Sequence, residues 1–250
     1  MRSFKRPLPF ILIADTSSSM KEHGKIASLN TAIKEMIQRL QLMQQDEEVQ
    51  FLITIVGFER GSIKEFFHAV NVQEIEWADL NASGVTPLGD AFLKVADLLG
   101  QEDVVPKNSY APILLLVSDG QPTDAKGHFS DGWRESLKLL KAAPRGDRGM
   151  AFAMAIGPDA DEDMLSAFSS NGKVFFANDG EKICQFFQLV TLATSVSLGK
   201  DPIGAVSAQD QQETILDKSL LKQSIKTKTT FSSLKQEKSV SIVLDDEPKI

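Results

Sequence analysis

The stretch ILIADTSSSM, residues 11–20, joins an apolar run directly to an aspartate and three serines. Residues 10–14 carry no polar side chain, which is typical of a strand buried on both faces of a sheet. Asp15, Ser17 and Ser19 then alternate, so an extended or looping backbone can point one carboxylate and two hydroxyls toward the same place. The stretch therefore predicts a buried strand whose carboxyl end carries a cluster of oxygen atoms.

Similar short apolar runs alternate along the chain with segments of helical period, which indicates α/β architecture. We expect strands at residues 10–14, 49–58, 63–70, 113–117, 151–156 and 173–177. We expect helices at residues 25–43, 88–99, 133–140 and 181–196, and another after an N-cap at Asp161. The link at residues 59–62 is too short for a parallel connection, so the third strand must be antiparallel. The prediction is a doubly wound, mostly parallel sheet of about six strands, with one antiparallel edge strand, flanked by about six helices.

The composition limits the class of protein. An apolar content of 42% is sufficient for a sizeable core, and a net charge of −7 argues against wide contact with nucleic acid or anionic membranes. The single Cys184 cannot form an internal disulfide, which fits a reducing compartment. Two prolines interrupt the apolar run after the basic start, so we interpret it as mature protein rather than a signal peptide. We expect a cytoplasmic protein.

Two further loops carry oxygen groups in similar positions. Thr86 lies in the segment SGVTPL, just before an expected helix, and Asp119 lies in SDGQPTD, just after the apolar run ILLLV. Sites of parallel-sheet proteins form at the carboxyl ends of strands, so we expect these groups to lie near Asp15. Two carboxylates and three hydroxyls are hard ligands that suit a small hard cation better than zinc.

The segments DTSSSM, GVTPLGDA and LLLVSDGQPTD together resemble the von Willebrand factor A domain family and its metal-ion-dependent adhesion site. That site has the form Asp-x-Ser-x-Ser, then a Thr, then an Asp, and all five positions are matched by Asp15, Ser17, Ser19, Thr86 and Asp119. Ser18 stands where many members have glycine, which bears on backbone flexibility rather than on the metal. The resemblance implies a Rossmann-like A domain over residues 1–198 and a site for Mg²⁺, with Mn²⁺ or Ca²⁺ as alternatives.

The resemblance also implies a function. In this family the metal binds an Asp or Glu of a protein partner, so the chain is expected to be a non-enzymatic interaction module. The loop sequences are most similar to bacterial stand-alone proteins of the tellurite-resistance TerY type. These are associated with a protein kinase and a PP2C-type phosphatase in stress-response or phage-defence systems. The alternative is a regulatory subunit of a metal-chelatase-like or AAA-type ATPase.

A metal-dependent hydrolase fits the sequence less well. A haloacid-dehalogenase type of phosphatase needs a second Asp where this chain has Ser17, and no G-x-S-x-G turn or P-loop is present. The three histidines, His23, His68 and His128, show no triad spacing and are expected to be surface or packing residues. Asp124 is compatible either with a role near the metal or with a turn, whereas solvated or capping roles are expected for Asp90 and Asp97.

Residues 199–250 form a polar C-terminal extension rich in Gln, Ser, Thr and Lys. We expect it to be a flexible or partner-docking tail. Its acidic end, LDDE at residues 244–247, could offer a carboxylate to the metal, and residues 227–233 could accept phosphate from a kinase.

Overall fold

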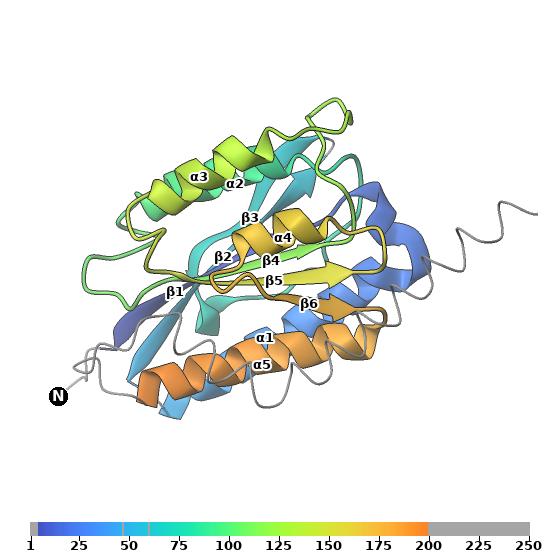
Figure 1. Cartoon of the computed structure of the whole chain (residues 1–250). Coiled ribbons are helices and arrows are strands. Elements are labelled where there is room, and N and C mark those ends of the chain that lie inside the picture. The colour runs from blue at the N-terminus through green and yellow to red at the C-terminus, as the bar shows by residue number, and fades with distance from the viewer. Residues whose placement is uncertain (1–4, 47, 60, 200–250) are drawn as a thin grey trace, which may run out of the picture.

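The computed structural model describes residues 5–46, 48–59 and 61–199 (Figure 1). In this part of the chain six strands form one sheet: β1 (Arg6–Ala14), β2 (Val49–Glu59), β3 (Ser62–Asn71), β4 (Ile113–Ser118), β5 (Met150–Ile156) and β6 (Val174–Ala177). The α-helices are α1 (Lys25–Asp46), α2 (Leu88–Leu99), α3 (Trp133–Ala142), α4 (Glu162–Phe168) and α5 (Gly180–Gly199). Two short 3-10 helices, η1 (Ser18–Gly24) and η2 (Val72–Glu74), complete the elements.

The strand order across the sheet is β3-β2-β1-β4-β5-β6. β1 pairs in parallel with both β2 and β4, and β5 and β6 continue the sheet in parallel. Only β3 is antiparallel, and it pairs with β2 at the edge of the sheet. The predicted doubly wound sheet with one antiparallel edge strand is therefore confirmed.

Helices cover both faces of the sheet, which explains why its central strands lack polar alternation. Leu8, Phe10 and Leu12 of β1 belong to the core under α1 and α5, whereas Ile11 and Ile13 belong to the core under α2, α3 and α4. Figure 1 shows these two helical layers on opposite sides of the sheet. Each of the five helices expected at particular residues is present in the described part of the chain, against an expected total of about six.

The order of the strands decides where a site can form. The chain proceeds from β1 to β2 on one side, and β4 then lies on the other side of β1. Ligands of doubly wound sheets bind where the strand order reverses in this way, outside the carboxyl ends of the strands. In this protein that position is between Ala14 of β1 and Ser118 of β4.

Among the described residues, no helix combines the length and apolar character needed to cross a membrane. The predicted tail, including its acidic end and its hydroxyl-rich segment, lies outside the residues that the structure describes.

Candidate metal centre

Asp15 is the first residue after β1 and is fully buried. Its backbone N–H continues the β1–β4 pairing by donating to the Val117 carbonyl at 2.9 Å. One carboxylate oxygen, Oδ1, accepts the N–H of Ser17 at 2.9 Å. The other, Oδ2, accepts the hydroxyl of Ser118 at 2.7 Å. The carboxylate is therefore held in a fixed orientation by the ends of two neighbouring strands.

A line of hydrogen bonds connects the first loop to the end of β4. The hydroxyls of Ser17 and Ser19 lie 2.9 Å apart, and the Ser19 hydroxyl donates to Asp119 Oδ1 at 2.7 Å. Ser17 and Asp119 are buried, while Ser18 between the two serines is exposed. The alternation predicted from the sequence is thus present, and it brings both hydroxyls to the side that faces Asp119.

Thr86 lies on a third loop that is hydrogen-bonded to the other two. The Ser18 N–H donates to the Gly84 carbonyl at 3.0 Å, which fixes this loop against the first. Thr86 and Thr123 exchange two hydrogen bonds, because the Thr123 N–H donates to the Thr86 carbonyl at 2.9 Å and the Thr123 hydroxyl accepts the Thr86 N–H at 3.0 Å. Within the described part of the chain, the Thr86 hydroxyl itself has no hydrogen-bond partner. This buried side chain therefore keeps an oxygen free for a ligand.

The two carboxylates repel each other. Burial, and then the charge of Asp119, raise the pKa of Asp15, while hydrogen bonds from Ser17 and Ser118 act in the opposite direction. Asp119 is compensated by Lys25, whose Nζ lies 2.8 Å from Oδ2. A cation placed between the three loops would remove the remaining repulsion.

The donor set fits a small divalent ion with oxygen ligands. No three His, Cys, Asp or Glu side chains converge in the described residues, so an ion bound there would need hydroxyl oxygens as well as carboxylates. The two carboxylates and the free Thr86 hydroxyl are oxygen ligands that Mg²⁺ accepts. The structure thus brings the predicted ligands to one edge of the sheet.

Three residues at this edge have roles that the sequence does not predict. Lys25 binds Asp119, and Ser118 binds Asp15. Thr16 closes the gap beyond the last β1–β2 pair, because its hydroxyl bonds both the N–H and the carbonyl of Phe58. The sequence offers only weak signals for these three residues. Lys25 is a lysine at the start of a helix, and Thr16 and Ser118 are polar residues at the ends of strands.

Other candidate residues have structural roles. Asp124 forms a turn, since its Oδ1 accepts the N–H groups of Lys126 and His128. Asp90 is exposed on α2, as expected. His68 binds Glu65 and Asp103 on the β3 side of the molecule, and so it takes no part in the oxygen cluster.

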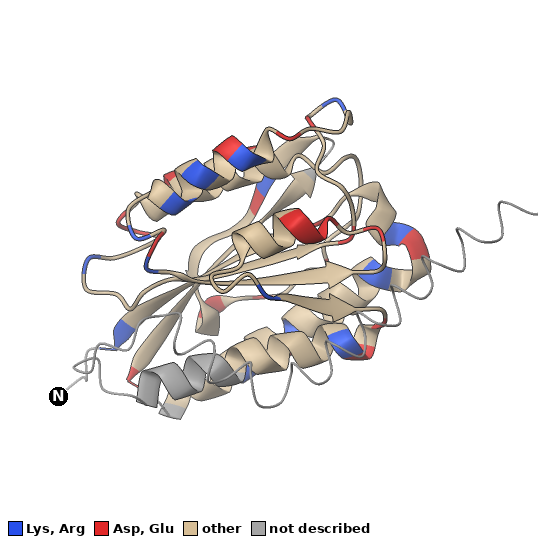
Figure 2. Cartoon of the chain, in the orientation of Figure 1, with Lys and Arg blue, Asp and Glu red and all other residues tan. Residues whose placement is uncertain are grey.

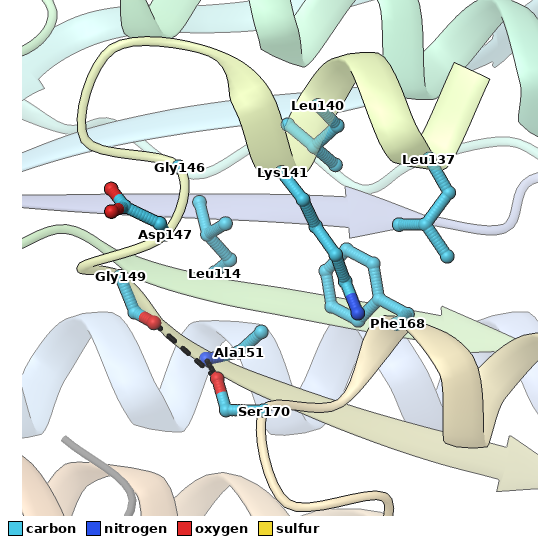
Figure 3. Close-up of a pocket in the computed structure, with 10 residues that line it drawn as sticks. All are labelled: Leu114, Leu137, Leu140, Lys141, Gly146, Asp147, Gly149, Ala151, Phe168 and Ser170. Carbon is cyan, nitrogen blue, oxygen red and sulfur yellow. Dashed lines mark hydrogen bonds between the residues drawn. The ribbon is translucent and has the colours of Figure 1, made fainter. Parts of the chain in front are cut away.

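A cavity of about 300 Å³ lies at the opposite, amino ends of β4 and β5 (Figure 3). Its wall is mostly apolar, with Leu114 and Phe168 among its residues. Two of the polar groups at its edge are bonded within the protein: Ser170 Oγ accepts the Ala151 N–H at 2.9 Å, and Lys141 donates to the Ala167 carbonyl at 2.6 Å. None of the predicted metal ligands lines this cavity, so it is separate from the oxygen cluster.

Comparisons with solved structures show the same fold at low identity. A von Willebrand factor type A protein from Catenulispora acidiphila has 16% identity and a TM-score of 0.57, with 78% of this chain and 44% of that chain covered. The pilus adhesin SpaC from Lactobacillus rhamnosus GG has 12% identity and a TM-score of 0.60, with 77% and 31% covered. Proximal thread matrix protein 1 from the mussel byssus, with a zinc-occupied MIDAS motif, has 14% identity and a TM-score of 0.56, with 75% and 48% covered.

In each case the present chain spans less than half of the other protein. No curated protein matches the sequence. The family model for the von Willebrand factor type A domain matches residues 10–189, which include all five predicted ligands. The chain therefore belongs to the von Willebrand factor type A domain family, a family of interaction and adhesion modules.

Proposed function

We propose that this protein is an interaction module that binds Mg²⁺ through Asp15, Ser17, Ser19, Thr86 and Asp119, and binds a partner's Asp or Glu through the metal. The observation that carries the proposal is the oxygen cluster at the reversal of strand order, where the Ser17, Ser19 and Asp119 side chains form one hydrogen-bonded line. Mn²⁺ or Ca²⁺ could replace Mg²⁺, since all three ions take oxygen ligands.

The hydroxyls of Ser17, Ser19 and Thr86 would contact the ion directly, and the two aspartates would hold it directly or through water. When bound, the ion supplies an open coordination position that attracts an oxygen from outside. Because the hydroxyls are neutral, they do not cancel the charge of the ion. The site therefore favours an anionic oxygen, such as a carboxylate, as the external ligand.

An interface around the metal also needs contacts that exclude water. Phe129 lies in the loop that follows Asp119, and 81% of its surface is exposed. The loop is fixed at its start by the two hydrogen bonds between Thr123 and Thr86. Phe129 pairs with Thr123 in an isolated β-bridge, which connects it through Thr123 to Thr86. A large exposed aromatic residue in this position is the kind of anchor that protein interfaces use.

We infer a non-catalytic role from membership in a family of interaction and adhesion modules. The loop sequences further support a cytoplasmic TerY-type stress or defence module with a kinase and a PP2C-type phosphatase as partners. The same site could serve a regulatory subunit of an AAA-type ATPase.

Calorimetric titration with Mg²⁺ tests the proposal. Thr86→Ala removes a hydroxyl with no partner inside the described protein, so it should weaken Mg²⁺ binding at least about tenfold, a change of about 1.4 kcal/mol, with little change in stability. Thr31→Ala is the matched control, because Thr31 is exposed on α1 and its hydroxyl donates to the Ala27 carbonyl within the helix.

A second titration, with Mg²⁺ at saturation, compares a short peptide that contains Asp with the same peptide containing Asn. We expect only the Asp peptide to bind, and only when Mg²⁺ is present. Failure of the wild type to bind Mg²⁺, or equal binding by wild type and Thr86→Ala, would contradict the proposed metal site.

A further inference from the structure

Lys25 is a partly buried cation beside the candidate metal centre. It is the first residue of α1, its side chain is only 15% exposed, and its Nζ lies 2.8 Å from Asp119 Oδ2. The other oxygen of the same carboxylate accepts the Ser19 hydroxyl at 2.7 Å. Asp119 therefore has one oxygen turned to the oxygen cluster and the other bound to an ammonium group.

The position of Lys25 is unusual for a lysine. The amino end of a helix carries a partial positive charge and favours acidic side chains. α4 follows this rule, since Glu162 and Asp163 lie in its first turn (Figure 2). α1 begins with Lys25 and has no acidic residue in its first turn. The carboxylate of Asp119, paired with Lys25, supplies the negative charge that the first turn of α1 lacks.

The side chain of Lys25 is also confined on its other side. Gly157 follows β5 with φ of +79°, and a Cβ atom there would lie 3.7 Å from Lys25 Cε and 3.8 Å from Nζ. The lysine thus extends from α1 along the end of β5 to the end of β4. This packing keeps the ammonium group beside Asp119 rather than in solvent.

We propose that Lys25 sets the charge of the metal centre, lowering its affinity for divalent ions and raising the affinity of the metal-loaded site for carboxylates. This inference rests on the proposed metal site and deepens it. The Lys25 ammonium group places one positive charge directly beside Asp119, so the site is one unit more positive, with or without the divalent ion, than it would be without the lysine. Without Lys25 the loaded site would be less positive and would attract a carboxylate less strongly.

Removing the charge of Lys25 should raise the affinity for Mg²⁺ and lower the affinity of the Mg²⁺-loaded site for carboxylates. Lys25→Met keeps an unbranched apolar stem but removes the charge. Because a unit charge in a partly buried site alters binding by about tenfold or more, Mg²⁺ should bind at least about tenfold more tightly to this variant. Acetate, as the smallest carboxylate probe, should bind the Mg²⁺-saturated variant several times more weakly than the wild type.

The experiment measures both constants in the full chain, with Mg²⁺ by calorimetry and acetate by amide chemical shifts at saturating Mg²⁺. Lys25→Arg keeps the charge and should give constants within about threefold of the wild type. Lys21→Met is the control for removal of a lysine from the same segment, since Lys21 is exposed. Thermal unfolding without metal checks that each variant is folded.

The outcomes separate the inference from the proposed function. If none of the proteins binds Mg²⁺, the metal site itself is wrong. If the wild type binds Mg²⁺ but Lys25→Met binds it equally or more weakly, the proposed role of the lysine charge is refuted while the metal site stands. The same holds if Lys25→Arg behaves like Lys25→Met. Tighter Mg²⁺ with weaker acetate, in Lys25→Met alone, supports the inference.

Discussion

Replacing Thr16 by valine removes one hydroxyl that serves two buried backbone groups. Thr16 is fully buried, and its Oγ1 accepts the Phe58 N–H at 2.7 Å and donates to the Phe58 carbonyl, also at 2.7 Å. The last paired residues of β1 and β2 are Ile13 and Val56. Phe58 lies beyond that pair, so the threonine side chain takes the place of the next hydrogen bonds of the β1–β2 ladder.

The expected loss of stability in Thr16→Val follows from the two Phe58 backbone groups that lose their partner. Valine has nearly the shape of threonine, so packing changes little. A buried donor or acceptor left without a partner costs about 1–3 kcal/mol. Two such groups at Phe58 should lower the free energy of unfolding by about 2–6 kcal/mol. Thr16→Ser keeps the hydroxyl and loses one buried methyl group, which costs only about 1 kcal/mol.

Urea unfolding of the wild type and both variants, with linear extrapolation to water, measures these differences. The valine variant should also bind Mg²⁺ more weakly, because Thr16 lies between Asp15 and Ser17 on the same loop. A loss in Thr16→Val of less than about 1 kcal/mol, or no greater than that in Thr16→Ser, would refute the assignment of the hydroxyl to both Phe58 groups.

Two further predictions concern stability away from the metal centre. Hydrogen bonds to Asp103, and then to Glu65, raise the pKa of His68, so the folded state holds the proton more tightly than the unfolded chain does. The stabilisation from this proton is complete below the ordinary histidine pKa of about 6.5 and is lost as the pH rises through the raised pKa. Thermal unfolding measured from about pH 5 to pH 9 should therefore show a decline in stability, and His68→Gln should reduce that decline. Asp161 caps α4 by accepting the Met164 N–H at 2.9 Å. Asp161→Ala should therefore lower the free energy of unfolding, measured with urea, by about 1 kcal/mol. Asp161→Asn can still cap the helix and should lower it by a few tenths of a kcal/mol at most.

Much of the fold follows from local patterns in the sequence. α2 begins and ends at the predicted residues, because Pro87 and Gly100 flank a segment of strict helical period. β3 is antiparallel as predicted, since the predicted link at residues 59–62 is too short for a crossover. The N-cap at Asp161 is also confirmed. In each case the signal and the structure that it specifies lie within a few residues of each other.

The supporting residues of the site could not be predicted in this way. Lys25 and Asp119 are 94 positions apart, Ser118 and Asp15 are 103 apart, and Thr16 and Phe58 are 42 apart. Periodicity places whole loops at the same edge of a sheet, but it does not indicate which single polar side chain connects one loop to another. That choice depends on the tertiary distances between strand ends.

The way in which the three loops are joined bears on what a metal would do. Backbone groups make the contacts between Asp15 and Val117 and between Ser18 and Gly84. Thr86 and Thr123 are joined by one backbone hydrogen bond and one to the Thr123 hydroxyl, so none of these contacts requires an ion. Lys25 already compensates one of the two buried carboxylates. In structural zinc sites, by contrast, the metal itself supplies the energy that folds the surrounding chain. The three loops are therefore already joined without a divalent ion, so folding does not depend on the metal as it does in structural zinc sites, and an ion bound here would keep a coordination position for an external carboxylate.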